Sequence, residues 1–296
     1  MLLFSEGGEH QPLIVEFLNT YFGKPVHDFQ VAYTEPLWNK YLFSHFDTTA
    51  AKAFGPYTVE NAIPWYTVMF VIACLLTVAI VWLLKGKLSQ DDPGKGQLTL
   101  EATILAIRDL IGSVIGDHGA RHFPVVATFA ILILVANLMG QFPLFMSPTA
   151  SVNVTYALGV SSFVYYNYIG ISENGLFGHL KHFAGPRLPL LMVPVTILIF
   201  MIEIISNSIR PFTLGVRLFA NMFSDEQVFV QITNLAPPFT HFVVPLALTV
   251  LGVFVAFVQA FVFTLLSMIY IGEVSHGPHD EHGHAEPIGD SAASHA

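Results

Sequence analysis

Five stretches of the chain are long, apolar and nearly free of charge. Residues 64–84 carry no charged side chain, and about 20 such residues are enough for a helix to cross the hydrocarbon core of a bilayer. Residues 123–146, 149–171 and 240–272 are also uncharged, and residues 188–235 carry only a few charges. This pattern predicts an all-α, polytopic membrane protein with about five transmembrane helices.

The last two apolar stretches are too long to stand upright in a bilayer. A helix over residues 240–272 would be about 50 Å long at ~1.5 Å per residue, against a hydrocarbon core of about 30 Å. Residues 188–235 have the same excess length, and Pro237-Pro238 makes a turn between the two. Two over-long neighbours predict a strongly tilted helical hairpin.

Residues 98–116 have a different pattern, in which apolar side chains recur at helical spacing. They are Leu100, Ile104, Ile107, Ile111 and Val114. Glu101, Arg108 and Asp109 interrupt the stretch with charge. The combination makes a poor span and a good interfacial helix, so one such helix is expected in addition to the spans.

Basic residues after the first span favour one orientation in the membrane. Lys85, Lys87 and Lys95 follow it directly. An excess of lysine and arginine in a short loop marks the cytoplasmic side, so the N-terminus is expected outside and the C-terminus in the cytoplasm. The polar residues 173–187 are then expected to form a cytoplasmic loop.

Composition divides the chain into three parts. Residues 1–62 precede the first span as an extracytoplasmic segment, and residues 63–273 form the membrane domain. Residues 274–296 are rich in histidine and low in complexity, which predicts a disordered cytoplasmic tail. These histidines could bind a metal or sense pH, but their spacing matches no defined site. No cofactor and no metal are therefore expected.

Composition also excludes several classes of protein. Of 296 residues 53% are hydrophobic and 11% charged, against about 25% charged in soluble domains. The net charge is −9 and no basic stripe exists, which argues against a nucleic-acid partner. The lone cysteine, Cys74, cannot form an internal disulfide. No G-x-x-x-x-G-K-[ST] loop is present, so any nucleotide chemistry belongs to partner chains.

One arginine lies deep in an apolar stretch. Between Arg187 and Glu273 the charged residues are Glu203, Arg210, Arg217, Asp225 and Glu226. A guanidinium stays protonated in essentially any protein environment and is costly in a bilayer, so Arg217 should face a protein interior or a water-filled path. It is therefore a candidate for ion movement. Alternatively, it snorkels to a headgroup or pairs with Glu203 or Glu226 as structural glue.

Polar positions recur along one face of the same stretch if it is helical. They are Glu203, Ser206 or Asn207, Arg210, Leu214, Arg217 and Asn221. Glu203 would lie about 21 Å from Arg217 along the axis, and Glu226 a further ~13 Å on the other side. Gln259 on the following span is a natural hydrogen-bond partner for the guanidinium. Two proton-accessible half-paths with a positive barrier between them would force protons onto a mobile carrier. The plainer alternative is a hydrogen-bonded helix interface.

These residues resemble a known family. The stretch SNSIRPFTLGVRLFANMFSDE (206–226), followed by VQAFVFTLLSMIYIG (258–272), closely resembles subunit a of the F-type ATP synthase, the stator of the membrane rotor. Supporting pieces in the family's order are PGKGQLTLE (93–101), NLMGQFP (137–143) and SVNVTYALG (151–159). The resemblance covers about residues 60–273.

The resemblance implies a role in proton translocation for each matching side chain. Arg217 looks like the stator arginine that faces the carboxylate of each passing c subunit. Asn221 and Glu226 match positions that line the outer half-channel. Glu203 and Ser206 match positions of the inner half-channel.

Two further positions match the family and three depart from it. Gln259 matches the glutamine beside the arginine, and Asn137 a polar residue of the central span. Some relatives have a histidine, cooperating with the outer-channel glutamate, where this chain has Gly252. Gly140 and Ser151 replace acidic residues found in some members near the outer mouth. Proton uptake is therefore expected to rely more on the glutamate and on ordered water.

The resemblance implies a non-catalytic, proton-translocating subunit in the bacterial cytoplasmic (inner) membrane. Its implied partners are the c-ring of proteolipid subunits, b-type peripheral stalk subunits, the catalytic head of the ATP synthase and membrane lipid. The residues alone leave two other classes open. A stand-alone secondary ion transporter would predict internal repeats, which the sequence lacks. A structural membrane scaffold would leave Arg217, Glu203 and Glu226 unexplained.

Overall fold

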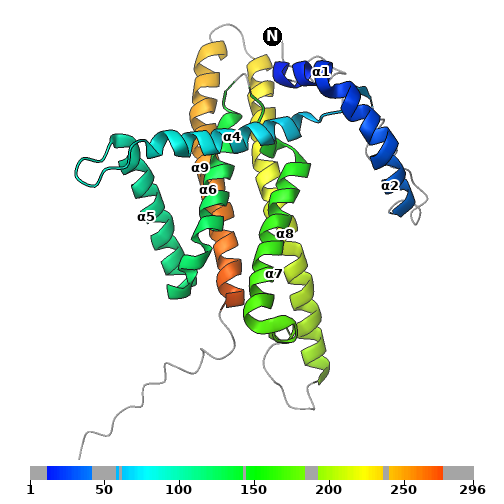
Figure 1. Cartoon of the computed structure of the whole chain (residues 1–296), viewed down its shortest axis with the longest axis vertical. Coiled ribbons are helices and arrows are strands. Elements are labelled where there is room, and N and C mark those ends of the chain that lie inside the picture. The colour runs from blue at the N-terminus through cyan, green and yellow to red at the C-terminus, as the bar shows by residue number, and fades with distance from the viewer. Residues whose placement is uncertain are drawn as a thin grey trace, which may run out of the picture.

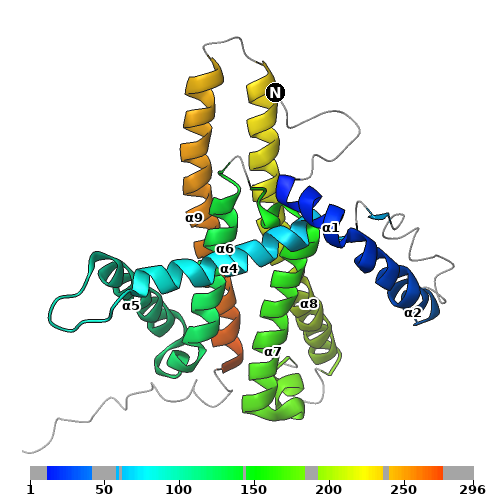
Figure 2. The ribbon, with the colours of Figure 1, turned by 45° about the horizontal axis from the view of Figure 1, so that its top comes forward.

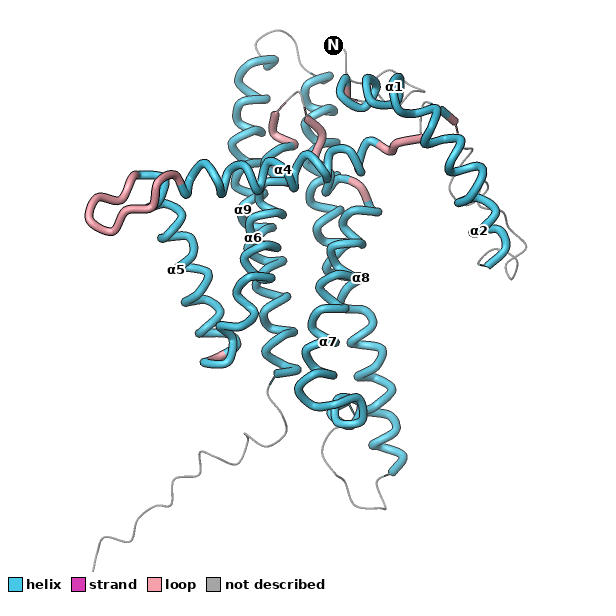
Figure 3. The backbone as a smooth tube through the Cα atoms, in the orientation of Figure 1, coloured by secondary structure: helices cyan, strands magenta, loops and turns pink. Residues whose placement is uncertain are grey.

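The described part of the chain is helical. The computed structural model describes residues 12–41, 58–59, 62–142, 145–183, 193–235 and 240–275, and no strand occurs within these ranges. The all-α class is therefore confirmed (Figure 3). The prediction of a disordered tail falls almost entirely on residues 276–296, which lie outside the described residues.

The helices follow one another in the order shown in Figure 1. They are α1 (Leu13–Phe29), α2 (Glu35–Tyr41), α4 (Trp65–Lys85), α5 (Lys95–Ile115), α6 (Phe123–Met139), α7 (Val152–Phe183), α8 (Val193–Leu235) and α9 (Thr240–Ser275). A π-helical segment, Gln30–Thr34, joins α1 to α2, and short 3-10 segments precede α6 and α7.

Four helical stretches in the described residues are long and apolar enough to cross a membrane. They are Trp65–Lys85, Gly119–Met139, Ile197–Val228 and Leu246–Ser275. The predicted span over residues 149–171 forms most of α7 but is more polar and is not among them. Five crossings therefore stay a prediction. Helix α5, expected at the interface, is also not among the four.

The long helices lie crosswise to the first span. Helices α6, α7, α8 and α9 run lengthwise beside one another, and α4 runs across them in both views (Figures 1 and 2). Helix α4 has 21 residues, a length of about 31 Å that matches an upright span. Helices α8 and α9 have 43 and 36 residues. If α4 stands upright, this arrangement makes the hairpin of α8 and α9 strongly tilted.

Helices α7 and α8 pack backbone against backbone. A Cβ atom at Gly159 would lie 2.6 Å from the carbonyl oxygen of Pro211, and one at Gly215 would lie 3.1 Å from that of Thr155. Small residues of this kind allow close helix contact in membranes. Helix α8 continues through Pro211. Behind this contact, Ile133 of α6, Leu218 of α8 and Phe263 of α9 belong to one buried apolar cluster.

One expected loop is helical instead. Residues 173–187 were predicted to form a polar cytoplasmic loop, but α7 extends to Phe183. Its direction changes at Gly175, where φ is 70° and ψ is 163°. Only glycine adopts this backbone region at little cost. The prediction was wrong because polar composition alone does not distinguish a loop from a helix exposed to solvent.

Candidate functional site

Arg217 lies on the exposed surface of α8. The helix is continuous from Val193 to Leu235, so the helical spacing used for the sequence prediction is confirmed. Among the described residues, no ion pair involves Arg217. The alternative in which it pairs with Glu203 or Glu226 is therefore not seen there, and the guanidinium faces outward from the chain.

Much of the hairpin that carries this arginine is apolar and exposed. On α8, Phe212 and Val216 are 54% and 37% exposed. On α9, Phe254, Val258 and Phe261 are also exposed. A permanent cation thus belongs to a pair of helices whose apolar side chains the described part of the chain leaves largely uncovered.

Asn221 and Gln259 join α8 to α9 one helical turn from Arg217. The Asn221 Nδ2 atom donates a hydrogen bond of 2.6 Å to Gln259 Oε1. Gln259 is 2% exposed, and its Nε2 atom has no partner in the described part of the chain. The described residues show no hydrogen bond from Arg217 to Gln259; the oxygen of Gln259 receives the Asn221 amide instead.

Polar groups lie between Glu226 and the C-terminal end of α6. The backbone N–H of Ser147 lies near the Glu226 carboxylate. The hydroxyl of Ser147 lies 2.7 Å from that of Thr149, which donates to Asn137 Oδ1 at 2.6 Å. Asn137 is fully buried. The sequence predicted Glu226 and Asn137 but missed the two hydroxyl residues between them, which lie at the short 3-10 segment Pro148–Ala150, outside the long helical patterns.

Asp225 belongs to a second polar cluster. Gln141 Nε2 donates to Asp225 Oδ2 at 3.1 Å. Gly252 of α9 lies against both side chains, because a Cβ atom there would come within 2.5 Å of Gln141 Nε2 and 2.8 Å of Asp225 Oδ2. The space that a larger residue at position 252 would need is therefore filled by the Gln141 amide, and the sequence reading missed this residue.

The other half of α8 carries a fork-shaped ion pair. Arg210 Nη1 and Nη2 donate to the two oxygens of Glu273 on α9, at 2.6 and 2.8 Å. Glu203 lies farther from the same guanidinium, at 3.7 Å. The ring of Tyr270 is 5.0 Å from the guanidinium carbon. The sequence left open whether Arg217 forms a structural ion pair. Among the described residues it is Arg210 that forms one.

Helical spacing alone did not distinguish Ser206 from Asn207, but their surroundings in the structure differ. Ser206 is exposed on α8, whereas Asn207 is 8% exposed. Asn207 Oδ1 accepts a hydrogen bond of 2.5 Å from the Tyr166 hydroxyl of α7. Asn207 therefore ties α8 to α7, and Ser206 is the side chain open to solvent or to a partner.

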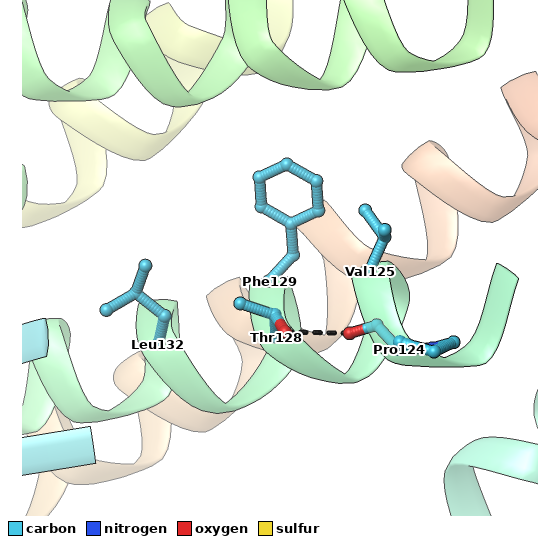
Figure 4. A pocket seen from close by; sticks show the side chains of 5 residues that line it. All are labelled: Pro124, Val125, Thr128, Phe129 and Leu132. Carbon is cyan, nitrogen blue, oxygen red and sulfur yellow. Dashed lines mark hydrogen bonds between the residues drawn. The ribbon is translucent and has the colours of Figure 1, made fainter. Parts of the chain in front are cut away.

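A shallow apolar hollow lies apart from these polar groups, along one face of α6 (Figure 4). It is lined by Pro124, Val125, Thr128, Phe129 and Leu132. Its one polar side chain, Thr128, donates to the Pro124 carbonyl oxygen at 2.7 Å. The hollow therefore presents no free polar group to a ligand, and the functional candidates stay on α8 and its neighbours.

The chain is similar to known proteins over most of its length. A family model described as ATP synthase A chain matches residues 67–272. ATP synthase subunit a of Geotalea daltonii is 43% identical over 201 residues, which cover 68% of this chain and 82% of that protein. ATP synthase subunit a of Solibacter usitatus is 39% identical over 224 residues, covering 73% and 90% respectively. The chain therefore belongs to the family of ATP synthase subunit a.

Proposed function

We propose that this chain is the proton-translocating stator subunit of a rotary F-type ATP synthase, with two offset half-channels that load and unload the carboxylates of a c-ring. The observation that carries the proposal is Arg217, which is exposed and has no ion-pair partner among the described residues, on a helix apolar enough to cross a membrane. A fixed cation inside a bilayer is costly unless a counter-charge meets it. A carboxylate on each passing c subunit supplies that charge.

The two half-channels lie at opposite sides of Arg217 along α8. Glu226 and Asn221 would line the outer one, and the network from Glu226 to Asn137 supports this role. Glu203 and Ser206 would line the inner one, about 21 Å along the helix axis from Arg217. Carboxylates in a partly hydrated cleft can pass protons, whereas an arginine cannot release its own.

Arg217 then does two things. It favours loss of the proton from an arriving c-subunit carboxyl, because a nearby cation stabilises the ionised form. It also prevents protons from running between the half-channels without rotation. Gln259 is buried within the hairpin, where its Nε2 atom has no partner among the described residues. Its bond to Asn221 fixes the position of α8 along α9 beside Arg217.

The other functions of the proposed ATP synthase belong to partner chains. The catalytic head would carry out the nucleotide chemistry, and b-type peripheral stalk subunits would hold this non-catalytic chain against rotation. We place it in the bacterial cytoplasmic (inner) membrane with its N-terminus outside and its C-terminus in the cytoplasm, because the loop after the first span is basic.

Two substitutions of Arg217 test the proposal in membrane vesicles. Arg217→Lys should abolish proton-driven ATP synthesis, because lysine can lose its charge when desolvated and lacks the planar fork. Arg217→Ala should abolish synthesis and also let protons leak in vesicles stripped of the catalytic head. The control is Arg108→Ala on the exposed surface of α5, which should retain synthesis. Near-normal coupled synthesis in Arg217→Ala vesicles would contradict the proposal.

A further inference from the structure

Glu273 is a charged residue near the end of α9 that lies just outside the family match. The family model ends at residue 272, one position before it. Glu273 is nevertheless the closest partner of Arg210, whose guanidinium also lies near Glu203 on its own helix. Glu203 is one of the carboxylates placed in the proposed inner half-channel. Two carboxylates with different positions therefore compete for one cation.

Arg210 can reach either carboxylate. Glu203 and Arg210 are seven residues apart, nearly two helical turns, so they lie on the same face of α8. Arg210 Nη2 is 3.7 Å from Glu203 Oε1, which is an ion pair but too long for a hydrogen bond. A small rotation of the long arginine side chain would close this distance. In the described part of the chain, the ion pairs of Arg210 involve these two carboxylates alone.

The structure shows that Glu273 holds the guanidinium. Arg210 Nη1 and Nη2 donate to its two oxygens at 2.6 and 2.8 Å, the fork geometry in which arginine binds a carboxylate most strongly. Tyr270, three residues before Glu273, places its ring 5.0 Å from the guanidinium carbon, which adds a cation–π contact. Helix α9 therefore contributes both groups that fix the guanidinium, and it draws Arg210 toward α9.

This arrangement leaves Glu203 without a hydrogen-bonded cation. Among the described residues, none donates a hydrogen bond to the Glu203 carboxylate, and its side chain is 34% exposed. A carboxylate that accepts hydrogen bonds from a guanidinium is held in its ionised form. Such a group would bind protons poorly. Glu203 avoids this state only as long as Arg210 stays bound to Glu273.

We propose that Glu273 is a positioning residue for proton release: by holding Arg210 on α9, it keeps Glu203 free to bind and release protons in the inner half-channel. This inference rests on the role of Glu203 in the proposed function. Arg210 itself is not needed for transport in this arrangement. It impedes transport when it is released from Glu273 and pairs with Glu203.

Proton transport by a single and a double variant tests this role. In Glu273→Gln the neutral amide cannot hold the fork, so Arg210 should turn to Glu203 and slow transport on the order of 10-fold, the size expected for an added hydrogen bond to a charged group. Adding Arg210→Gln removes the captured cation and should restore most of the wild-type rate. Proton-driven ATP synthesis is measured in vesicles, per assembled complex, well below the temperature of inactivation. Glu16→Gln, on the exposed surface of α1, is the control and should keep the wild-type rate.

Restoration distinguishes a positioning role from a structural one, because the fork is absent from both the single and the double variant. A structural role predicts that the double variant is as slow as Glu273→Gln or slower. That result would overturn the proposal, as would a wild-type rate in Glu273→Gln. Glu273→Asp keeps the charge on a shorter side chain and should give a smaller loss that Arg210→Gln also restores. It provides the same comparison if Glu273→Gln does not assemble.

Glu203→Gln separates failure of this inference from failure of the proposed function. A wild-type rate in Glu203→Gln would mean that the inner half-channel is assigned wrongly, and the role of Glu273 would fail with it. If Glu203→Gln slows transport but Arg210→Gln does not restore Glu273→Gln, the half-channel assignment stands and the role of Glu273 alone is wrong.

Discussion

At the scale of single residues, the polar side chains around α8 differ in whether they can give up a proton. Arg217 cannot, and amides such as Asn221 and Gln259 only donate and accept hydrogen bonds. Glu226 and Glu203 can bind and release protons. The proposed path therefore has titratable groups at its two ends and a permanent cation between them.

Glu226 should be essential where its neighbour is not. Glu226→Gln removes the titratable group next to the Ser147–Thr149–Asn137 network and should slow proton-driven ATP synthesis severely. Asp225→Asn makes the same carboxylate-to-amide change one residue away and should have a much smaller effect, because Asp225 bonds to Gln141 instead. ATP synthesis and proton flux in vesicles measure both. Equal losses in the two variants would refute the assignment.

Gly252 and Gln141 should act as one unit. A methyl group at position 252 would overlap the Gln141 amide, so Gly252→Ala should displace that side chain and break its bond to Asp225. Gln141→Ala removes the bond directly. Each single change should lower the rate of proton transport roughly 2- to 10-fold, the equivalent of one hydrogen bond.

The double variant distinguishes this coupling from two separate effects. Gly252→Ala combined with Gln141→Ala should be no slower than either single variant, since both remove the same bond. Rates of passive proton flux in head-stripped vesicles measure all three. If the losses multiply, the two residues act independently and the geometric argument is wrong.

At the scale of elements, the hairpin of α8 and α9 is fastened on both sides of Arg217. Asn221 and Gln259 bond on one side, and Arg210 and Glu273 on the other. Both are contacts between side chains of the two helices, so they fix the register of one helix along the other. The surface that carries Arg217 lies between these two contacts.

The Arg210–Glu273 pair should contribute measurably to stability. Glu273→Gln replaces a fork of two charged hydrogen bonds, and the cost should be about 1 kcal/mol, discounted because the Glu273 side chain is 39% exposed. Heat inactivation of ATP-driven proton pumping should then shift down by about 2–4 °C. Glu16→Gln makes the same change at an exposed position of α1 outside the hairpin; it is the matched control and should shift the midpoint less. Equal shifts would show that the fork has no special role.

At the scale of the whole molecule, α4 packs crosswise against the long helices α8 and α9 (Figure 2). Helix α4 has the length of an upright span. If α4 stands upright, α8 and α9 offer a long, inclined apolar surface along which a curved partner such as a ring of helices can pass. This arrangement supports the proposed rotary function.

The orientation of the whole chain is testable with reporter fusions. A fusion after residue 290 should report the cytoplasm, because the basic loop after α4 is expected there and an odd number of crossings places the termini on opposite sides. A fusion within residues 1–11 serves as the comparison and should report the outside. A reporter that is active outside at residue 290 would overturn the proposed topology.

Local sequence patterns were sufficient to predict the helices and the position of Arg217 among them. Hydropathy and helical period depend on residues close together in the sequence, so the spans at 64–84 and 240–272 and the polar row on α8 could be predicted from it. The length of the apolar stretches also predicts that this hairpin is tilted in the membrane, and the tilt stays a prediction. Residues 173–183 were assigned wrongly as a loop because a polar segment can be either a loop or an exposed helix.

Tertiary structure alone decided which polar groups meet. Arg210 and Glu273 are separated by 63 residues, and Gln141 and Asp225 by 84. No local pattern relates such positions, because their contact depends on the angle and sliding position of packed helices. The same packing buried Asn207 and left Ser206 exposed. It also left Arg217 without an ion-pair partner among the described residues, which supports the proposal that its charge meets another subunit.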